Sequence, residues 1–175
     1  LTGPHVAPNG MVEKLSAGNI RLLNREDRLG FQTPDWRLGR TISHRLWTIT
    51  LHYHEWIYRL AEIAATDAPQ SYQASSLFKH FLSDWLLNVD VDRVGARDLA
   101  WNAYATATRI TWWIRAYYTM PVSFWSVEGD LEEAFLKGLW KQAAYLHEHL
   151  EYDLLANHIL RDAVGLAWAG RFFDA

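Results

Sequence analysis

Apolar side chains recur at three- and four-residue steps along most of the chain beyond about residue 40, and this periodicity predicts amphipathic helices. The first stripe runs over residues 46–64 and ends at Asp67-Ala68-Pro69, because proline disfavours helical geometry in the residue before it. Further stripes predict helices over residues 72–87, 102–120, 130–154 and 158–173. The last stripe is apolar nearly all round, so we expect that helix to be the most buried element.

The order of these elements predicts an all-α fold built from antiparallel helical hairpins, because no segment shows sustained period-two alternation. Such hairpins form bundles, solenoids and toroids alike, and periodicity alone does not choose among them. Residues 1–40 lack a periodic pattern and contain turn-forming pairs such as Gly3-Pro4 and Pro34-Asp35. We interpret residues 1–40 as an irregular arm with a short extended piece at residues 20–23, and residues 41–175 as one helical domain.

The aromatic content changes this picture, because 10 Trp, 8 Tyr and 7 Phe are more than a core of this size needs. We therefore expect some tryptophans to lie exposed in a ligand groove. The net charge of -3 with mixed signs along the chain argues against a nucleic-acid partner. The chain has no Cys, which excludes disulfides, thiolate metal sites and a Cys nucleophile.

Membrane, targeting and cofactor signals are also weak. No apolar run is long enough for a membrane span, and no signal peptide is visible, although the chain opens on Leu1 and we expect its natural N-terminus to be missing. His147 and Glu151 share a helix face, but no third ligand stands at a suitable spacing, so no metal and no other cofactor is expected.

Three stretches carry more information than generic helix. They read LWTITLHYHEW at residues 46–56, WNAYATATRITWWI at residues 101–114, and HLEYDLLANHIL at residues 149–160, running into AWAGRFF at residues 167–173. In order and spacing they resemble the N-terminal helical domain of the heparinase II/III family, over residues 24–173. Two departures are Ala156, where the family commonly has Gly, and Trp112, where it commonly has Asn.

The resemblance implies part of an incomplete (α/α) toroid, followed in the parent protein by a β-sandwich domain. It also implies cleavage of uronic-acid polysaccharides such as heparan sulfate or alginate by β-elimination, in a periplasmic or secreted protein. Asn157, assisted by His158, matches the family's carboxylate-neutralising position, a role that preorganised donors perform. The family's acid/base Tyr comes later in its chain, and a further His lies on or near the β-sandwich. Because this chain ends at Ala175, we expect its catalytic set to be incomplete.

Four further residues are candidates for the substrate groove. The Arg109 guanidinium suits a carboxylate or sulfate, which it can bind through two parallel hydrogen bonds. Trp101 and Tyr104 are candidates for stacking on sugar rings, and His54 for lining the same groove. The alternatives are a surface salt bridge for Arg109, helix-start packing for Trp101 and Tyr104, and a helix N-cap for Asn157.

Other functions remain open at this point. The chain can be a non-catalytic carbohydrate-binding or scaffolding domain, or a helical interaction module whose aromatic residues meet a protein partner. The enzymatic alternative is a fragment of an (α/α) toroid glycoside hydrolase, with its paired acids among Glu55, Glu148 and Glu151.

Overall fold

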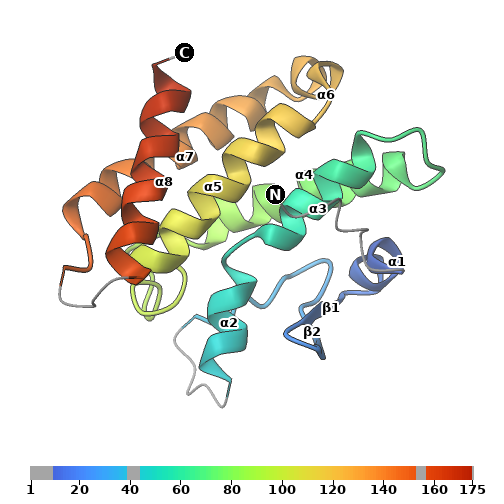
Figure 1. Ribbon diagram of the computed structural model, residues 1–175. Coiled ribbons are helices and arrows are strands. Elements are labelled where there is room, and N and C mark those ends of the chain that lie inside the picture. The colour runs from blue at the N-terminus through green and yellow to red at the C-terminus, as the bar shows by residue number, and fades with distance from the viewer. Residues whose placement is uncertain (1–9, 39–43, 153–156, 175) are drawn as a thin grey trace.

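Helices make up nearly all of the regular structure in this computed structural model, which describes residues 10–38, 44–152 and 157–174 (Figure 1). The prediction of an all-α fold is therefore confirmed. The one sheet in the described ranges is a two-stranded antiparallel hairpin. In chain order the elements are α1 (Met11–Ser16), β1 (Asn19–Leu22), β2 (Arg25–Arg28), α2 (Arg45–Leu51), α3 (Glu55–Ala64), α4 (Ser71–Asn88), α5 (Ala103–Thr119), α6 (Val122–Val127), α7 (Gly129–Glu148) and α8 (Asn157–Phe173).

The five long helices form two layers, with α3, α5 and α8 in one and α4 and α7 in the other. Helix α5 contacts α3, α7 and α8, and it lies between the α3–α4 pair and the α7–α8 pair (Figure 1). Ring contacts between Tyr104 and His158 near the start of α5 and α8, and between Tyr117 and Phe172 near their ends, mean that these two helices run in the same direction. Helix α7 runs antiparallel to α5, since Arg109 meets Gln142 at one end of α7 and Tyr117 meets Glu132 at the other.

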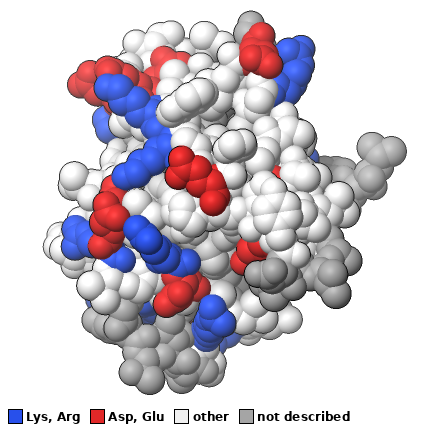
Figure 2. Space-filling view, turned by 90° about the vertical axis from the view of Figure 1, so that its left-hand side faces the viewer, with Lys and Arg blue, Asp and Glu red and all other residues white. Residues whose placement is uncertain are grey.

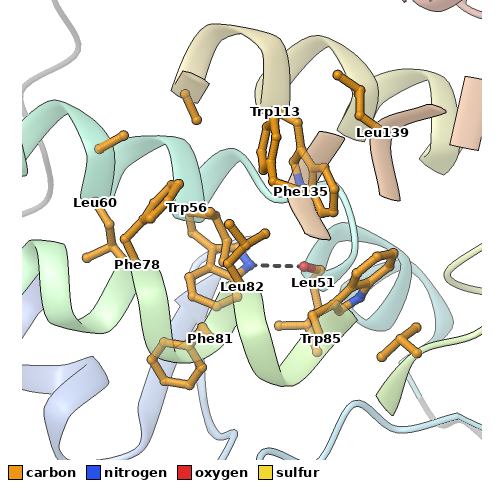
Figure 3. Packing of buried hydrophobic residues seen from close by; sticks show 14 of the residues in the cluster. Leu51, Trp56, Leu60, Phe78, Phe81, Leu82, Trp85, Trp113, Phe135 and Leu139 are labelled. Atoms are coloured by element: carbon orange, nitrogen blue, oxygen red, sulfur yellow. Dashed lines mark hydrogen bonds between the residues drawn. The ribbon is translucent and has the colours of Figure 1, made fainter. Parts of the chain in front are cut away.

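The first predicted helix is in fact two helices, so the prediction of one continuous helix over residues 46–64 is wrong. Helix α2 ends at Leu51, and His54 has a left-handed backbone with φ of 61° directly before α3 begins. The Trp56 indole nitrogen donates a hydrogen bond of 2.9 Å to the Leu51 carbonyl oxygen, which compensates a group that the interrupted helix leaves free (Figure 3). The apolar stripe continues across the break, which is why periodicity does not reveal it.

The N-terminal segment is also more ordered than predicted. The extended piece is confirmed as β1, but the irregular arm is wrong for residues 11–28, which form α1 and the β1–β2 hairpin. Residues 29–38 contain no helix or strand, as predicted. Val12, Leu15, Ile20 and Trp36 of this segment are buried in the same hydrophobic cluster as the long helices.

Most of the tryptophans belong to the core rather than to a groove. Seven of the ten are buried, and the large rings of α3, α4, α5 and α7 pack against one another around Trp85 and Trp113 (Figure 3). Trp140 and Trp168 are the exposed ones, on α7 and α8. The seven buried tryptophans are Trp36, Trp47, Trp56, Trp85, Trp101, Trp113 and Trp125.

Helix α8 is not the most buried element, which corrects the prediction from its composition. Its buried residues are Asp162, Gly165 and Ala169, whereas Leu160 is 65% exposed and Trp168 is 41% exposed. It rests on α5 and α7 through its buried residues and through the partly buried Leu166 and Phe172, while other apolar side chains of the helix face outward. Helix α6 is a short element that the periodicity did not predict.

Gly165→Ala is expected to lower the free energy of unfolding by about 2 kcal/mol, because overpacking forces packed backbones apart. A methyl group at residue 165 would lie 2.8 Å from the Ala107 Cα on α5, where the backbone cannot easily move. Gly170 on the same helix has open space around its Cα, so Gly170→Ala should instead stabilise the helix by about 0.5 kcal/mol. Urea unfolding of both variants checks this, and equal effects of the two substitutions would contradict the tight α5–α8 contact.

Candidate functional site

The first turn of α8 lies against the first turn of α5, and this contact brings two predicted site residues together. The His158 and Tyr104 ring centroids are 5.0 Å apart. His158 keeps 40% of its side chain exposed, and its Nδ1 lies 2.7 Å from a carboxylate oxygen of Glu151. Asn157 precedes His158 as the first residue of α8 and is exposed. A ligand in solvent can therefore reach this end of the helix.

Tyr53 and Arg161 complete a group that we call the tyrosine–histidine cluster, formed by Tyr53, Tyr104, Glu151, His158 and Arg161. The Tyr53 and Tyr104 ring centroids are 5.9 Å apart, and the Arg161 guanidinium lies 5.7 Å from the Tyr104 ring centroid. Burial, followed by the neighbouring Tyr104, raises the pKa of Tyr53, while Arg161 acts in the opposite direction. The phenol therefore stays protonated at neutral pH and can donate a hydrogen bond.

Asp162 ties the cluster to the segment that precedes α8. Its carboxylate accepts a hydrogen bond of 3.1 Å from the backbone N–H of Glu151, and the side chain is fully buried. Burial raises the pKa of Asp162 above its usual range. This bond fixes Glu151 where its own carboxylate can hold the His158 ring.

Arg109, which the sequence places in the groove, lies instead in the core. Its side chain is 0% exposed, and its guanidinium sits 4.5 Å from the Trp85 ring centroid. It donates to the Gln142 side-chain oxygen at 2.6 Å and to the carbonyl oxygens of His52 and Ala100 at 3.0 and 2.7 Å. A side chain in this position cannot contact a polysaccharide, so neither a groove contact nor a surface salt bridge describes it.

His54 and Trp101 are buried beside Arg109, which corrects two further groove predictions. His54 is 0% exposed and its Nδ1 accepts a hydrogen bond of 2.9 Å from the Trp113 indole. Trp101 is 3% exposed and donates to the Val89 carbonyl oxygen at 3.0 Å. The helix-start packing considered for Trp101 is the correct interpretation, whereas Tyr104 remains half-buried within reach of solvent.

Burial keeps the two core histidines neutral. Burial, with the nearby charge of Arg109 as a second cause, lowers the pKa of His52 to about 3. The same two causes, with His52 itself as a third, hold the pKa of His54 well below its usual range. The Trp85 indole donates to the His52 Nδ1 at 3.2 Å, so the proton of the neutral ring is on Nε2, facing the Trp36 carbonyl oxygen.

The family model for the heparinase II/III N-terminus matches residues 26–174. The chain belongs to this family. No curated protein and no solved structure matches it. The family relates this heparinase II/III N-terminal domain to polysaccharide lyases and to polysaccharide substrates.

Two members of the cluster in this heparinase II/III domain were missed from the sequence. Tyr53 lies in the first of the three informative stretches, but its position in the apolar stripe of residues 46–64 predicts core packing rather than a site role. Arg161 follows the third stretch one turn after Asn157, and its distance of four residues from Asn157 was the available signal. Glu151 was considered as a metal ligand or hydrolase acid, and the structure pairs it with His158 instead.

The surface of the heparinase II/III domain shows no area of a single charge on the face where α7 and α8 lie. Figure 2 shows basic and acidic side chains side by side there, with a broad uncharged area beside them. Among the residues described, no group of three or more His, Asp or Glu side chains is placed to hold a metal ion. None of the helices in these ranges is long and apolar enough to cross a bilayer.

Proposed function

We propose that this domain binds a uronic-acid-containing polysaccharide, of the heparan sulfate or alginate type, for β-elimination. The observation that carries the proposal is the contact between Tyr104 and the first turn of α8. It gathers Asn157 and His158, which match the family's carboxylate-neutralising position, with Tyr53, Tyr104 and Arg161 at one accessible place.

The chemistry of these groups suits the substrate. Removal of the C5 proton of a uronate becomes easier when donors hold the carboxylate and the negative charge that develops on it. The Asn157 amide is a neutral donor of this kind, and Arg161 adds a cation nearby. Glu151 holds the His158 ring in one orientation. A side chain that transfers a proton to or from a substrate needs such a fixed orientation.

The domain is further proposed to be the helical part of a larger lyase-like protein. The two layers, α3, α5 and α8 against α4 and the antiparallel α7, support a segment of an (α/α) toroid. The resemblance assigns the acid/base Tyr and a further His to later parts of the family's chain, including a β-sandwich domain. Residues 1–175 by themselves are therefore expected to bind the polysaccharide without cleaving it. The family resemblance also supports a periplasmic or secreted location for the protein.

Asn157→Asp and Asn157→Ala test the role of Asn157 as a pair. Asp is nearly isosteric with Asn and is equally good at a helix start, so it preserves a capping role, whereas Ala does not. A carboxylate-binding role predicts the opposite order, since Asp repels a uronate. We expect Asn157→Asp to lower the affinity for an alginate hexasaccharide by about tenfold or more, with an unchanged melting temperature.

Titration calorimetry and thermal unfolding measure the two quantities on the same samples. If Asn157→Asp binds like the wild type while Asn157→Ala loses stability, Asn157 is only a helix cap. Absorbance of an unsaturated uronate, produced by the isolated chain, would contradict the expectation that it binds without cleaving.

A further inference from the structure

The outward face of α5, between α3 and α8, continues away from the tyrosine–histidine cluster. Tyr104, Thr108, Thr111 and Arg115 stand at steps of four, three and four residues, so they share one side of the helix. This side is opposite to the one that meets α7. The rise of an α-helix places Arg115 about 16 Å along the axis from Tyr104. Between them stand two small side chains, Thr111, which is half-buried, and Thr108, which is buried, so the surface between the two ends is low.

At the far end of this face, Arg115 lies over two aromatic rings. Its guanidinium is 4.9 Å from the Trp112 ring centroid and 5.3 Å from the Tyr58 ring centroid. The two rings are themselves 5.1 Å apart with an angle of 30° between their planes. Trp112 comes from α5 and Tyr58 from α3, so the contact between these two neighbouring helices positions the rings under the cation.

Arg115 is exposed and has no carboxylate partner within the ranges that the structure describes. The neighbouring Arg59 differs, because it binds Glu55 at 3.0 Å and Glu62 at 2.7 Å. These two carboxylates are therefore occupied by Arg59, and the donors of the Arg115 guanidinium are available to an anion from solution.

The same arrangement occurs at the cluster, where Arg161 lies over the Tyr104 ring and has no carboxylate partner in the described ranges. One face of the domain thus carries two arginines on aromatic rings, one at each end of the stretch from Tyr104 to Arg115. A guanidinium binds a carboxylate or sulfate with two parallel hydrogen bonds, and aromatic rings offer flat apolar surfaces to sugar rings.

We propose that Arg115, Trp112 and Tyr58 form a second subsite for an acidic sugar, so that one saccharide chain lies along α5 and is held at both ends. The inference rests on the proposed function, since it extends the ligand bound at the cluster. The recognised group is an anionic substituent on a sugar, either a carboxylate or a sulfate.

The test compares Arg115→Gln with wild type for two lengths of alginate oligosaccharide, a disaccharide and a hexasaccharide. Loss of one charge-assisted contact should lower the affinity for the hexasaccharide about tenfold. The disaccharide is too short to reach from the cluster to Arg115, so its affinity should not change. Arg93→Gln is the matched control, because Arg93 is an exposed arginine in the connection between α4 and α5.

The outcomes separate this inference from the proposed function. The second subsite is wrong if Arg115→Gln binds the hexasaccharide as Arg93→Gln does, or if both lengths lose affinity equally. Binding that responds to Arg115→Gln but not to Asn157→Asp would keep the subsite and overturn the role of the cluster. Absence of binding by either length would overturn both. A heparan sulfate hexasaccharide in a parallel titration distinguishes sulfate from carboxylate by which ligand loses more affinity.

Discussion

Arg109→Ala is expected to lower the free energy of unfolding by about 4 kcal/mol, because the substitution leaves several buried acceptors without their donor. Arg109 connects α5 to the α2–α3 break through the His52 carbonyl, to the segment before α5 through the Ala100 carbonyl, and to α7 through Gln142. All of these partners are neutral, and burial lowers the pKa of Arg109 to about 9, so the guanidinium remains charged at neutral pH.

Arg115→Ala is the matched control for this loss. Arg115 is on the same helix but exposed, and substitutions at such positions change stability by about 0.5 kcal/mol or less. Urea unfolding at pH 7.5 measures both variants. If Arg109→Ala lowers the free energy of unfolding by less than about 1 kcal/mol, the hydrogen bonds of Arg109 do not hold α5, α7 and the α2–α3 break together.

Acidification from pH 7.5 to pH 5 is expected to destabilise the domain strongly, through the two core histidines. The pKa of His52 falls from an ordinary 6.5 to about 3 on folding, so the unfolded chain binds a proton over a pH range where the folded chain does not. The stabilisation is therefore complete above about pH 6.5 and is lost as the pH falls towards 3. At pH 5 His52 alone should contribute a loss of about 2 kcal/mol, and His54 acts in the same direction.

His52→Gln isolates this effect from other titrating groups. The variant is expected to be less stable at pH 7.5 but to lose less on acidification, because Gln does not titrate. His147→Gln removes an exposed histidine and should keep the full loss. The comparison is necessary because burial raises the pKa of Asp162, which works in the opposite direction. An unchanged pH dependence in His52→Gln would show that His52 is not responsible.

The long helices could be predicted because their apolar stripes coincide with their buried faces, as in α4, α5 and α7. The break between α2 and α3 could not, because it depends on distant partners. The Trp56 indole and the Arg109 guanidinium compensate carbonyl groups at the end of α2, and Trp113 from α5 binds His54. The apolar periodicity of residues 46–64 does not depend on these contacts, so it cannot reveal the break.

Sequence reasoning was weakest for buried polar residues. An arginine among aromatic residues predicts a groove cation, yet the rings around Arg109 belong to the core. The tryptophan surplus misled for the same reason, since a core built on indole rings also needs acceptors for their N–H groups. His52, His54 and the Val89 carbonyl supply such acceptors. The pairing of Tyr104 with His158 required the parallel docking of α8 on α5, which no motif encodes.

The division of the tyrosine–histidine cluster between two helices links its assembly to the opening of α8. Tyr104 stands on α5, whose amide protons should be among the slowest to exchange with solvent, because its neighbours bury it on several sides. His158 and Arg161 stand on α8, which has few buried residues and should open at a smaller free-energy cost. Each opening of α8 separates His158 and Arg161 from Tyr104, while the rest of the core remains folded. A ligand held at the cluster therefore protects the whole of α8 from exchange, and its apparent affinity includes the cost of keeping that helix docked.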